Sequence, residues 1–280
     1  MPELPEVEVM RRDLEREVVG KRIKSVDVPG SMRAIRRHRQ RKLFTAPLEG
    51  CKITAVDRRG KYLVLTLDSG DAIVVHLGMA GQLRRAKTAR EKMAKHTHVV
   101  ISFSQGGQLR FVDPRTFGEM FVTHADDVDK EVEELTHLGY NPLETAVSWD
   151  YFGELVRARK AKLKPLLMDQ KFIAGIGNIY SDEILFTAGL RWDRASESLS
   201  PEEVRRLYRA ISEVLHDAVK YRGSSLSDGQ YVDLFGKPGE YQLHHKVYAQ
   251  EGQACRRCRR PIVKGKAGSR STYYCEACQV

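Results

Sequence analysis

Cysteine is scarce in this chain: five occur among 280 residues, and tryptophan is scarcer still, with two. No apolar run is long enough to cross a membrane. Such a composition excludes an extended disulfide framework and a membrane-spanning protein, and we expect a soluble one. With 41% hydrophobic residues, the chain can bury cores in two domains of ordinary size.

The few cysteines are concentrated at the end of the chain. Four of the five fall within the last 26 residues, in two Cys-x-x-Cys pairs that are separated by 16 residues: Cys255, Cys258, Cys275 and Cys278. Each pair can direct two thiolates at one ion, and residues 259–274 suffice for a two-stranded ribbon between the pairs. Two disulfides of a secreted domain are the alternative, but they would leave Cys51 unpaired, and no secretory apolar segment opens the chain. The spacing predicts one structural zinc ion in a cytosolic zinc ribbon.

Acidic residues are outnumbered, 37 against 47 Lys and Arg, which gives a net charge of +10. Residues 241–280 carry eight Lys or Arg and two Glu, and therefore six of these ten net charges. Two more basic runs lie at 33–42 and 157–164, whereas 119–154 holds ten acidic residues and one lysine. This segregation predicts contact with the phosphates of duplex DNA. For the run at 33–42, an ordinary solvated surface explains the charges equally well.

The first half of the chain predicts strands behind one opening helix. Val7, Met10, Leu14 and Val18 recur at helical spacing and would bury one stripe. Short β-branched or alternating runs follow between turn residues, at 53–57, 61–68, 72–77, 97–103 and 108–112. Repeated hairpins of this kind are typical of a β-sandwich.

The pattern becomes helical after the acidic stretch 126–143. Ser148 can cap a helix, and residues 200–203 form a capping box with proline at the first helical position. Between them, residues 164–180 predict two short helices around a glycine turn. Its Gly-x-Gly lacks the third glycine and the preceding strand of a dinucleotide site. We therefore favour a helix-turn-helix relative whose turn amides bind a phosphate together with Asn178.

Pro2 is a candidate nucleophile. Removal of the initiator methionine is expected before a small residue and would leave Pro2 with a free secondary amine. An α-amino group has a pKa of about 8 and a lysine about 10.4, so far more of the terminal amine is unprotonated at neutral pH. Its attack on a sugar C1′ would give a cationic iminium, with Glu3 and Glu6 nearby for proton transfer. Considered alone, these residues can equally well be an ordinary first helical turn.

Five motifs, in order along the chain, carry a resemblance to a known family. They are residues 1–8 (MPELPEVE), 76–81 (HLGMAG), 113–118 (DPRTFG), 175–180 (GIGNIY) and the terminal four-cysteine finger. Together they resemble the formamidopyrimidine-DNA glycosylase family. The resemblance implies an α+β fold: an N-terminal helix and a two-layered β-sandwich, then a helix-two-turn-helix domain with a C-terminal zinc ribbon. We expect domains at 1–135, 136–240 and 241–280.

The resemblance also implies a function. It predicts a monomeric, cytoplasmic, nucleoid-associated base-excision repair enzyme that removes 8-oxoguanine and formamidopyrimidines from double-stranded DNA and, as a lyase, cuts the strand by β,δ-elimination. Pro2 matches the Schiff-base nucleophile, Glu3 the donor of a proton to the opening deoxyribose, and Lys61 the proton donor in β-elimination. Arg270 matches the finger arginine associated with δ-elimination. Because arginine does not readily release a proton, we expect it to position a phosphate.

Further residues match DNA contacts of the family. Met79 and Phe117 match side chains that fill the gap left by an extruded base, and Arg115 matches the partner of the orphaned cytosine. Many relatives have a second arginine where this chain has Thr116. Segment 222–239 is expected to close over the extruded base and to be mobile without DNA. Phosphate contacts are expected at His96, which can equally be an ordinary surface residue, and at Arg159, Lys164 and Asn178.

Two other functions stay open from the sequence. The endonuclease VIII branch of the same superfamily applies the same proline chemistry to oxidised pyrimidines, although Leu4, Met79 and the Arg115-x-Phe117 pattern favour the purine branch. A DNA-binding zinc-ribbon protein without catalysis would need only the basic surface. The presence of every expected catalytic residue favours an enzyme.

Overall fold

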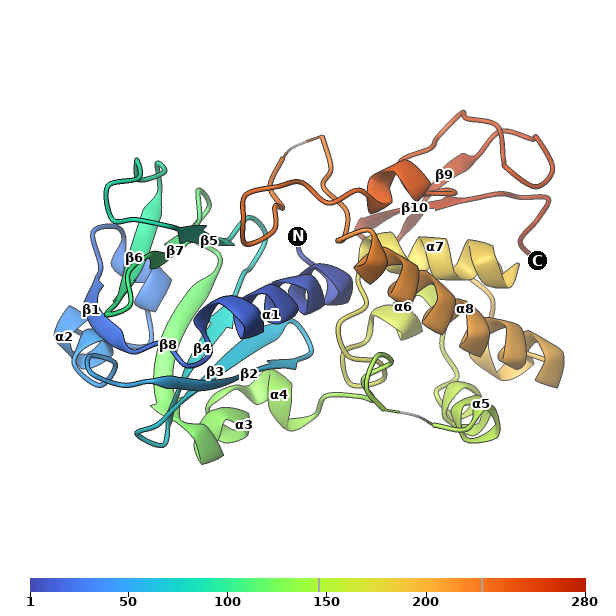
Figure 1. The fold of residues 1–280 in the computed structure, drawn as a ribbon. Coiled ribbons are helices and arrows are strands. Elements are labelled where there is room, and N and C mark those ends of the chain that lie inside the picture. Colours follow the sequence, from blue (N-terminus) through green and yellow to red (C-terminus); the bar gives the residue numbers. More distant parts are fainter. Residues whose placement is uncertain (146, 228) are drawn as a thin grey trace. The chain divides into compact units, whose positions relative to one another are not determined.

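The computed structural model describes residues 1–145, 147–227 and 229–280 (Figure 1). They form two compact units, one of Met1–Thr136 with Tyr221–Glu240 and the other of His137–Lys220 with Tyr241–Val280. From the sequence, residues 221–240 are expected in the helical domain 136–240, whereas in the structure they pack into the first unit. The chain therefore returns to the first unit after its longest helix and then leaves it again.

The first unit opens with helix α1 (Leu4–Val18), which has proline in its first turn. The backbone amide of Glu3 donates to the Glu6 carboxylate at 2.8 Å, so the helix begins with a capping-box interaction. The apolar stripe predicted for this helix is confirmed, since Val7, Met10, Leu14 and Val18 are all buried in one core.

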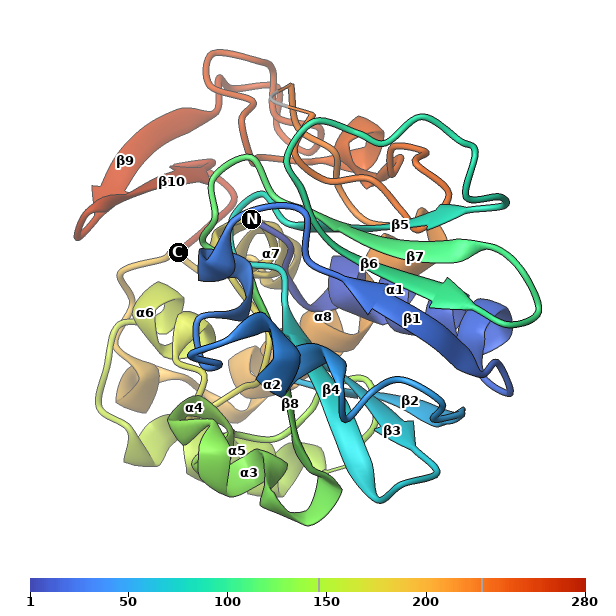
Figure 2. The same ribbon diagram turned by 90° about the vertical axis from the view of Figure 1, so that its left-hand side faces the viewer.

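Two antiparallel four-stranded sheets follow α1, and they confirm the two-layered β-sandwich (Figure 2). One sheet has the order β1-β6-β7-β5, from β1 (Ile23–Asp27), β5 (Gln82–Ala86), β6 (Thr97–Phe103) and β7 (Gln108–Val112). The other has the order β2-β3-β4-β8, from β2 (Ile53–Arg59), β3 (Tyr62–Leu67), β4 (Asp71–His76) and β8 (Glu119–His124). Five of these strands match the predicted runs, whereas β1, β5 and β8 were not anticipated.

The core of the first unit lies between its two sheets. Alternate residues of the strands point inward, among them Leu65 of β3, Ile73 of β4 and Phe111 of β7, and they form one cluster with the stripe of α1. Phe44 of α2 (Arg41–Thr45) joins the same cluster. The acidic stretch after β8 folds into two short helices, α3 (Val128–Glu131) and α4 (Glu133–Thr136).

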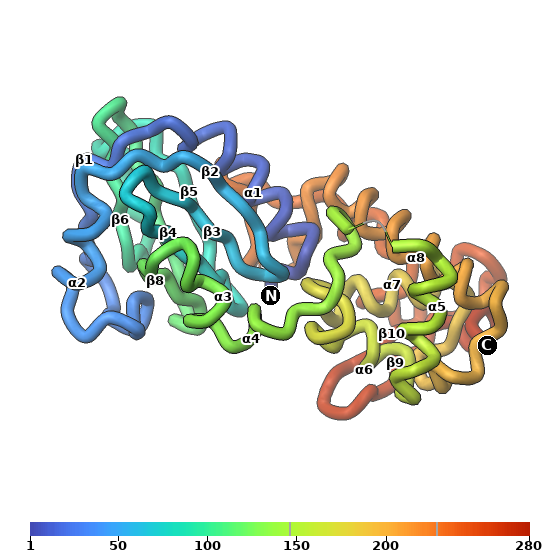
Figure 3. Tube along the Cα trace, turned by 90° about the horizontal axis from the view of Figure 1, so that it is seen from below, coloured from blue at the N-terminus to red at the C-terminus, as the bar shows by residue number. Residues whose placement is uncertain are grey.

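The second unit is helical, as predicted, and ends in a two-stranded ribbon. Its helices, seen together in Figure 3, are α5 (Trp149–Ala158), α6 (Leu163–Met168), α7 (Asn178–Ala188) and α8 (Pro201–Lys220). Both predicted caps are present: Ser148 Oγ accepts from the amide of Tyr151 at 3.2 Å, and Ser200 and Glu203 exchange bonds at 2.9 and 3.3 Å. The ribbon pairs β9 (Val263–Ala267) with β10 (Arg270–Tyr274). Among the helices of the described ranges, none combines the length and apolarity that crossing a bilayer requires.

The attachment of α1 to the sandwich can be tested at Leu14, which is fully buried. Leu14→Ala should lower the free energy of unfolding of the first unit by about 2–5 kcal/mol, because it leaves a cavity in the core. Leu43→Ala is the matched control, since Leu43 on α2 is 54% exposed, and it should change stability by less than about 0.5 kcal/mol. Urea titrations measure both, and equal losses would contradict this packing.

Candidate active site and zinc centre

The start of α1 places two buried carboxylates next to Pro2. Pro2 itself is buried, and Glu3 and Glu6 are 2% and 1% exposed. Besides the amide of Glu3, the Glu6 carboxylate accepts the backbone amide of Ser224 at 2.7 Å. A Cβ atom on Gly223 would come within 2.7 Å of the same carboxylate, so glycine is required there. The acidic groups that the sequence analysis placed beside the nucleophile are thus held in fixed positions.

The hairpin that carries Lys61 is attached to α1 by a buried ion pair. Arg58 Nε lies 2.9 Å from the Glu8 carboxylate, and the Arg58 side chain is fully buried. Arg58 also donates to the carbonyl of Gly60 at 3.3 Å, within the turn that precedes Lys61. Glu8 and Arg58 therefore fix the hairpin of the catalytic candidate Lys61 relative to α1, the helix that Pro2 precedes.

Glu8 is surrounded by three arginines, which together with it form the Glu8 cluster. It also accepts hydrogen bonds from Arg11 and, at 2.7 Å, from Arg12. Burial alone would raise the pKa of Glu8, but the hydrogen bonds from these arginines and Arg58 lower it to about 2. The carboxylate is therefore ionised throughout the physiological range. This cluster was missed from the sequence, where Glu8 was one residue of a motif.

The loops that carry Met79 and Phe117 lie against each other. A Cβ atom on Gly78 would approach the backbone of Phe117 and Gly118 within 2.6 Å, and Gly78 has a positive φ of 61°. Only glycine permits so close an approach. Met79 and Phe117 are 38% and 52% exposed, as expected for residues at loop tips, and the Arg115 guanidinium lies 5.0 Å from the Phe117 ring centre. The three expected gap-filling residues are thus brought together.

Asp113 organises the loop from Arg115 to Gly118. Its buried carboxylate accepts the amide of Arg115 at 3.0 Å and the amide of Gly118 at 2.8 Å. Its own amide donates to the carbonyl of His96 at 3.0 Å, which ties the expected phosphate contact His96 to the same loop. Thr116, within the same loop, adopts a positive φ of 52°. In the sequence Asp113 is one residue of the motif 113–118, and its structural role becomes visible only in the fold.

In the second unit, the glycine turn between α6 and α7 is held by Gln170. Its side-chain amide accepts from Gly175 at 2.8 Å and donates to Ile176 at 2.9 Å. Asn178 is the first residue of α7, and its side-chain oxygen is buried with no hydrogen-bond partner among the described residues. Arg159 ends α5 with an exposed side chain whose guanidinium lies 5.9 Å from the Phe172 ring centre. Arg159 is therefore accessible to a ligand outside the chain, whereas Asn178 is half-buried and its side-chain oxygen is enclosed.

Lys164, by contrast, is fully buried. Its ammonium lies 2.8 Å from the Asp182 carboxylate and 3.0 Å from the carbonyl of Ser271. Asp182 also accepts the Thr272 hydroxyl at 2.8 Å and the Tyr273 amide at 3.0 Å. Burial raises the pKa of Asp182 to about 6, and the charge of Lys164 opposes this rise. The lysine that the sequence analysis expected at a phosphate lies instead beneath the strand that begins with Arg270.

Glu183, the next residue of α7, fixes the segment that precedes the ribbon. Its fully buried carboxylate accepts the backbone amides of residues 246, 247 and 248 at 2.8–3.0 Å. Asp182 and Glu183 therefore attach both β10 and the segment before the ribbon to α7. Neither residue is among the site residues expected from the sequence, although two consecutive acidic residues inside an otherwise apolar helix are a recognisable signal.

Arg270 lies at the edge of an open hollow of about 410 Å³. Its exposed guanidinium makes a contact of 3.8 Å with the sulfur of Met168. The hollow is lined by the turn 267–269 and by residues of α6 and its end, Lys164, Pro165, Met168 and Asp169. A cationic side chain at the mouth of such a hollow is suited to an anionic group.

The four terminal cysteines form the zinc centre. Their sulfur atoms all lie within 4.8 Å of one another, with 3.8 Å between Cys255 and Cys278 and 3.4 Å between Cys258 and Cys275. Thiolates bound tetrahedrally to zinc, each at about 2.3 Å, would be about 3.8 Å apart, so the cluster fits one structural zinc ion. Its buried members Cys255 and Cys275 pack with Phe186 of α7, Val247 and Ile262.

Part of the basic run at 33–42 is already paired within the protein. Arg36 and Arg37 each lie 3.0 Å from the carboxylate of Glu119. The Arg37 guanidinium also lies 4.1 Å from the centre of the Phe121 ring. These two arginines therefore have a partner within the protein. For this part of the run at 33–42, the charges are explained without a contact to DNA.

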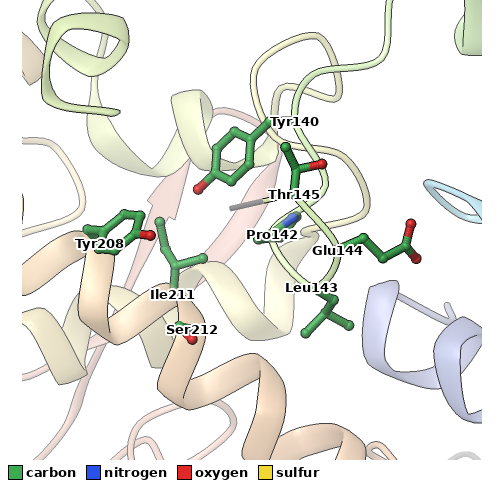
Figure 4. Close-up of a pocket in the computed structure, with 8 residues that line it drawn as sticks. All are labelled: Tyr140, Pro142, Leu143, Glu144, Thr145, Tyr208, Ile211 and Ser212. Carbon is green, nitrogen blue, oxygen red and sulfur yellow. The ribbon is translucent and has the colours of Figure 1, made fainter. Parts of the chain in front are cut away.

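A separate pocket of about 240 Å³ lies in the second unit, between the segment 140–145 and α8 (Figure 4). Tyr140 and Tyr208 contribute phenol groups, and the Tyr208 hydroxyl donates to the carbonyl of Val147 at 2.7 Å. Glu144 is the one acid in its lining, and no expected site residue is among the lining residues. The pocket is therefore not part of the candidate active site.

Three family models match successive parts of the chain. The formamidopyrimidine-DNA glycosylase N-terminal domain matches residues 1–120, the H2TH domain of the same glycosylase matches 138–230, and a zinc finger found in FPG and IleRS matches 252–280. The last match covers the four-cysteine cluster and supports its assignment to zinc.

Known proteins are similar over the whole chain. A formamidopyrimidine-DNA glycosylase of Pelotomaculum thermopropionicum is 40% identical, with 100% of this chain and 99% of the relative covered. The crystal structure of the MutM (Fpg) protein from Thermus thermophilus is 41% identical, with a TM-score of 0.87 and coverage of 99% and 98% of the two chains. A complex of Lactococcus lactis Fpg with DNA containing an abasic site is 33% identical, with a TM-score of 0.89 and 99% of each chain covered.

The zinc assignment predicts a defined stoichiometry. The purified protein should contain one zinc ion per chain, and Cys275→Ser should lose it, because three thiolates leave the site incomplete. Cys51→Ser is the matched control, since half-buried Cys51 lies outside the cluster, and it should keep the metal. Elemental analysis with a thiol-reactivity assay measures both variants, and zinc retained in Cys275→Ser would contradict the four-cysteine site.

The Glu8 cluster predicts a pH-dependent contribution to stability. Because folding lowers the pKa of Glu8 from 4.5 to about 2, the stabilisation is complete above pH 4.5 and disappears as the pH falls toward 2. The shift corresponds to about 3 kcal/mol. Glu8→Gln should therefore be less stable than the wild type at pH 6, and the difference should shrink by pH 3. Urea midpoints at both pH values measure it, with exposed Asp57→Asn on β2 as the control, and a constant difference would contradict the assignment.

Proposed function

Because the chain belongs to the formamidopyrimidine-DNA glycosylase family, we propose that it is a bifunctional glycosylase and abasic-site lyase for oxidised purines in double-stranded DNA. Its substrates would be 8-oxoguanine and formamidopyrimidines. Support for binding damaged DNA comes from relatives solved in complex with DNA that contains an abasic site or Fapy-dG.

The observation that carries the proposal is the arrangement around the start of α1. After Met1 is removed, the Pro2 nitrogen attacks C1′ of the damaged nucleotide, and the bond from C1′ to the base breaks. Glu3, buried beside Pro2, gives a proton to the ring oxygen as the deoxyribose opens. The product is an iminium on the Pro2 nitrogen, which cannot lose a proton from nitrogen and therefore accepts electrons in the next step.

Strand cleavage follows from this iminium. A base, for which solvent water suffices, takes a proton from C2′, and the C3′–O bond breaks to release the 3′ phosphate in β-elimination. Loss of a proton from C4′ to water and cleavage of the C5′–O bond then release the 5′ phosphate in the second elimination. Lys61 is proposed as the proton donor of the first elimination, and the pair of Glu8 and Arg58 would keep its hairpin against α1. A guanidinium does not release a proton at neutral pH, so Arg270 is not proposed as a proton donor. It is proposed to hold a phosphate by its charge.

Recognition of the damaged site requires that the base leaves the helix. Met79 and Phe117 are exposed on adjacent loops, and we propose that they fill the gap, while Arg115 bonds the orphaned cytosine. His96, Arg159 and Asn178 are proposed as phosphate contacts. For Lys164, the buried pair with Asp182 supports a different role, in which the lysine positions the strand of Arg270 from beneath.

The proposal is tested by trapping the iminium. With a duplex that contains 8-oxoguanine opposite cytosine, borohydride should give a covalent adduct, and peptide mass analysis should map it to Pro2. An undamaged duplex is the substrate control. Pro2→Leu, whose large second residue disfavours removal of Met1, should form no adduct although it should still bind DNA.

The same experiment separates the alternatives. A stronger adduct with thymine glycol than with 8-oxoguanine would identify an endonuclease VIII-like preference for pyrimidines. Tight, salt-sensitive binding without any adduct, from protein whose intact mass shows that Met1 has been removed, would identify a DNA-binding protein without catalysis.

A further inference from the structure

Segment 221–240 is built into the first unit at several points. Its two ends are joined by a hydrogen bond of 2.8 Å from the Glu240 amide to the Tyr221 carbonyl. Leu234 is fully buried in the sandwich core, and its carbonyl accepts the amide of Arg85 on β5 at 2.9 Å. Gln82, also on β5, donates to the carbonyl of Gln230 at 2.7 Å. Asp228 lies outside the described residues.

Arg222 connects this segment to α1 through two buried carboxylates. Its guanidinium lies 2.7 Å from the Asp233 carboxylate and also contacts Asp13 of α1. The Asp13 and Asp233 side chains are 2% and 1% exposed, whereas Arg222 is 38% exposed. We call this set, Asp13, Arg222 and Asp233, the Arg222 clamp. One guanidinium thus separates two buried negative charges, and without it those charges would face each other with little solvent.

Asp233 uses its other oxygen to shape the turn that follows. That oxygen accepts the amides of Phe235 at 3.0 Å and Lys237 at 2.8 Å, and the Asp233 amide donates to the Lys237 carbonyl at 2.8 Å. The clamp therefore fixes the turn 233–237 relative to α1, because Asp233 holds the turn with one oxygen and Arg222 with the other.

The backbone at Arg222 supports the same conclusion. Arg222 has a φ of 60° and the following Gly223 a φ of 78°. Glycine adopts this left-handed region freely, whereas a residue with a side chain does so at a cost. The guanidinium contacts compensate for a conformation that glycine would adopt without strain.

The clamp lies on the face of α1 that also reaches the start of the same segment. Glu6 and Asp13 are seven residues apart and therefore lie on one face of the helix, and Glu6 accepts the amide of Ser224 at 2.7 Å. Pro2 and Glu3 stand at the beginning of this helix. The segment and the proposed nucleophile Pro2 are thus both attached to the same helix, α1.

We propose that the Arg222 clamp is a positioning device for base excision, which fixes the base-covering segment 222–239 relative to the nucleophile on α1. This inference rests on the proposed function. An extruded 8-oxoguanine has to be held while the bond to C1′ breaks, whereas an abasic site offers no base for the segment to cover. Loss of the clamp should therefore slow base excision selectively and spare cleavage at an abasic site.

Two variants test the clamp. Arg222→Gly removes the guanidinium and suits the positive φ, and Asp13→Asn keeps the shape of the side chain but removes its charge. Single-turnover rates of 8-oxoguanine release should fall by about 10-fold or more for Arg222→Gly and by about 3-fold for Asp13→Asn, because small misplacements of reacting groups are costly. Cleavage of a preformed abasic site should stay within about 2-fold of the wild type. Glu15→Gln is the matched control, since 56% exposed Glu15 on the same helix pairs only with Arg11 among its described ion pairs, and it should leave both rates unchanged.

The outcomes distinguish the clamp from the proposed function. If both rates fall together, or if neither variant slows base release, the positioning role is overturned while the glycosylase assignment stands. If the wild type releases no 8-oxoguanine, the proposed function fails, and the inference fails with it. Should Arg222→Gly not fold, the isosteric Asp13→Asn, with abasic-site cleavage as its folding control, decides the question.

Discussion

The buried ion pair of Glu8 and Arg58 is the interaction on which the proposed catalytic end of the molecule depends. Glu8 lies on α1, Arg58 lies at the end of β2, and their side chains are 5% and 0% exposed. A charge buried to this degree is tolerated only with its partner in place. The pair therefore permits only one arrangement of α1 and the hairpin of β2 and β3. Any displacement of one relative to the other would separate the ion pair and leave a buried charge without its partner.

The same logic applies to the whole of α1. Its apolar stripe packs into the sandwich, as in an ordinary amphipathic helix, but the acidic residues Glu3, Glu6, Glu8 and Asp13 are buried as well, each at most 4% exposed when backbone and side chain are counted together. Each of the last three accepts hydrogen bonds from another part of the first unit or from the start of α1. A helix fixed on two sides in this way cannot rotate or slide without breaking several buried polar contacts. Such rigidity is what the proposed nucleophile Pro2, just before the first residue of α1, would require.

Much of the fold could be predicted from local patterns, and the missed parts have physical reasons. The strands β3 and β4 are continuous apolar runs, which periodicity detects, whereas β5 (Gln82–Ala86) contains two arginines and β8 lies at the start of an acidic stretch. Both are strands because of their neighbours in the sheet, which the local sequence does not contain. For the site, the zinc cysteines and the exposure of Met79 and Phe117 follow from spacing and loop position. The burial of Lys164 could not be predicted, because its partner Asp182 is distant in sequence and a lysine in a basic run ordinarily lies at the surface.

The packing of segment 221–240 into the first unit could not be predicted from local patterns either, because it depends on contacts with residues far away in the sequence. Continuity with α8 suggested the helical region, yet Leu234 fills the sandwich core and Arg222 meets a carboxylate of α1. This crossing has a mechanical consequence that does not depend on how the two units are arranged. A segment held within the unit of Pro2, Glu3 and Lys61 moves with them, so a base that it covers would remain in register with the nucleophile during any motion between units. The proposed phosphate contacts of Arg159 and Asn178, which belong to the second unit, would then be independent of the position of the base relative to Pro2.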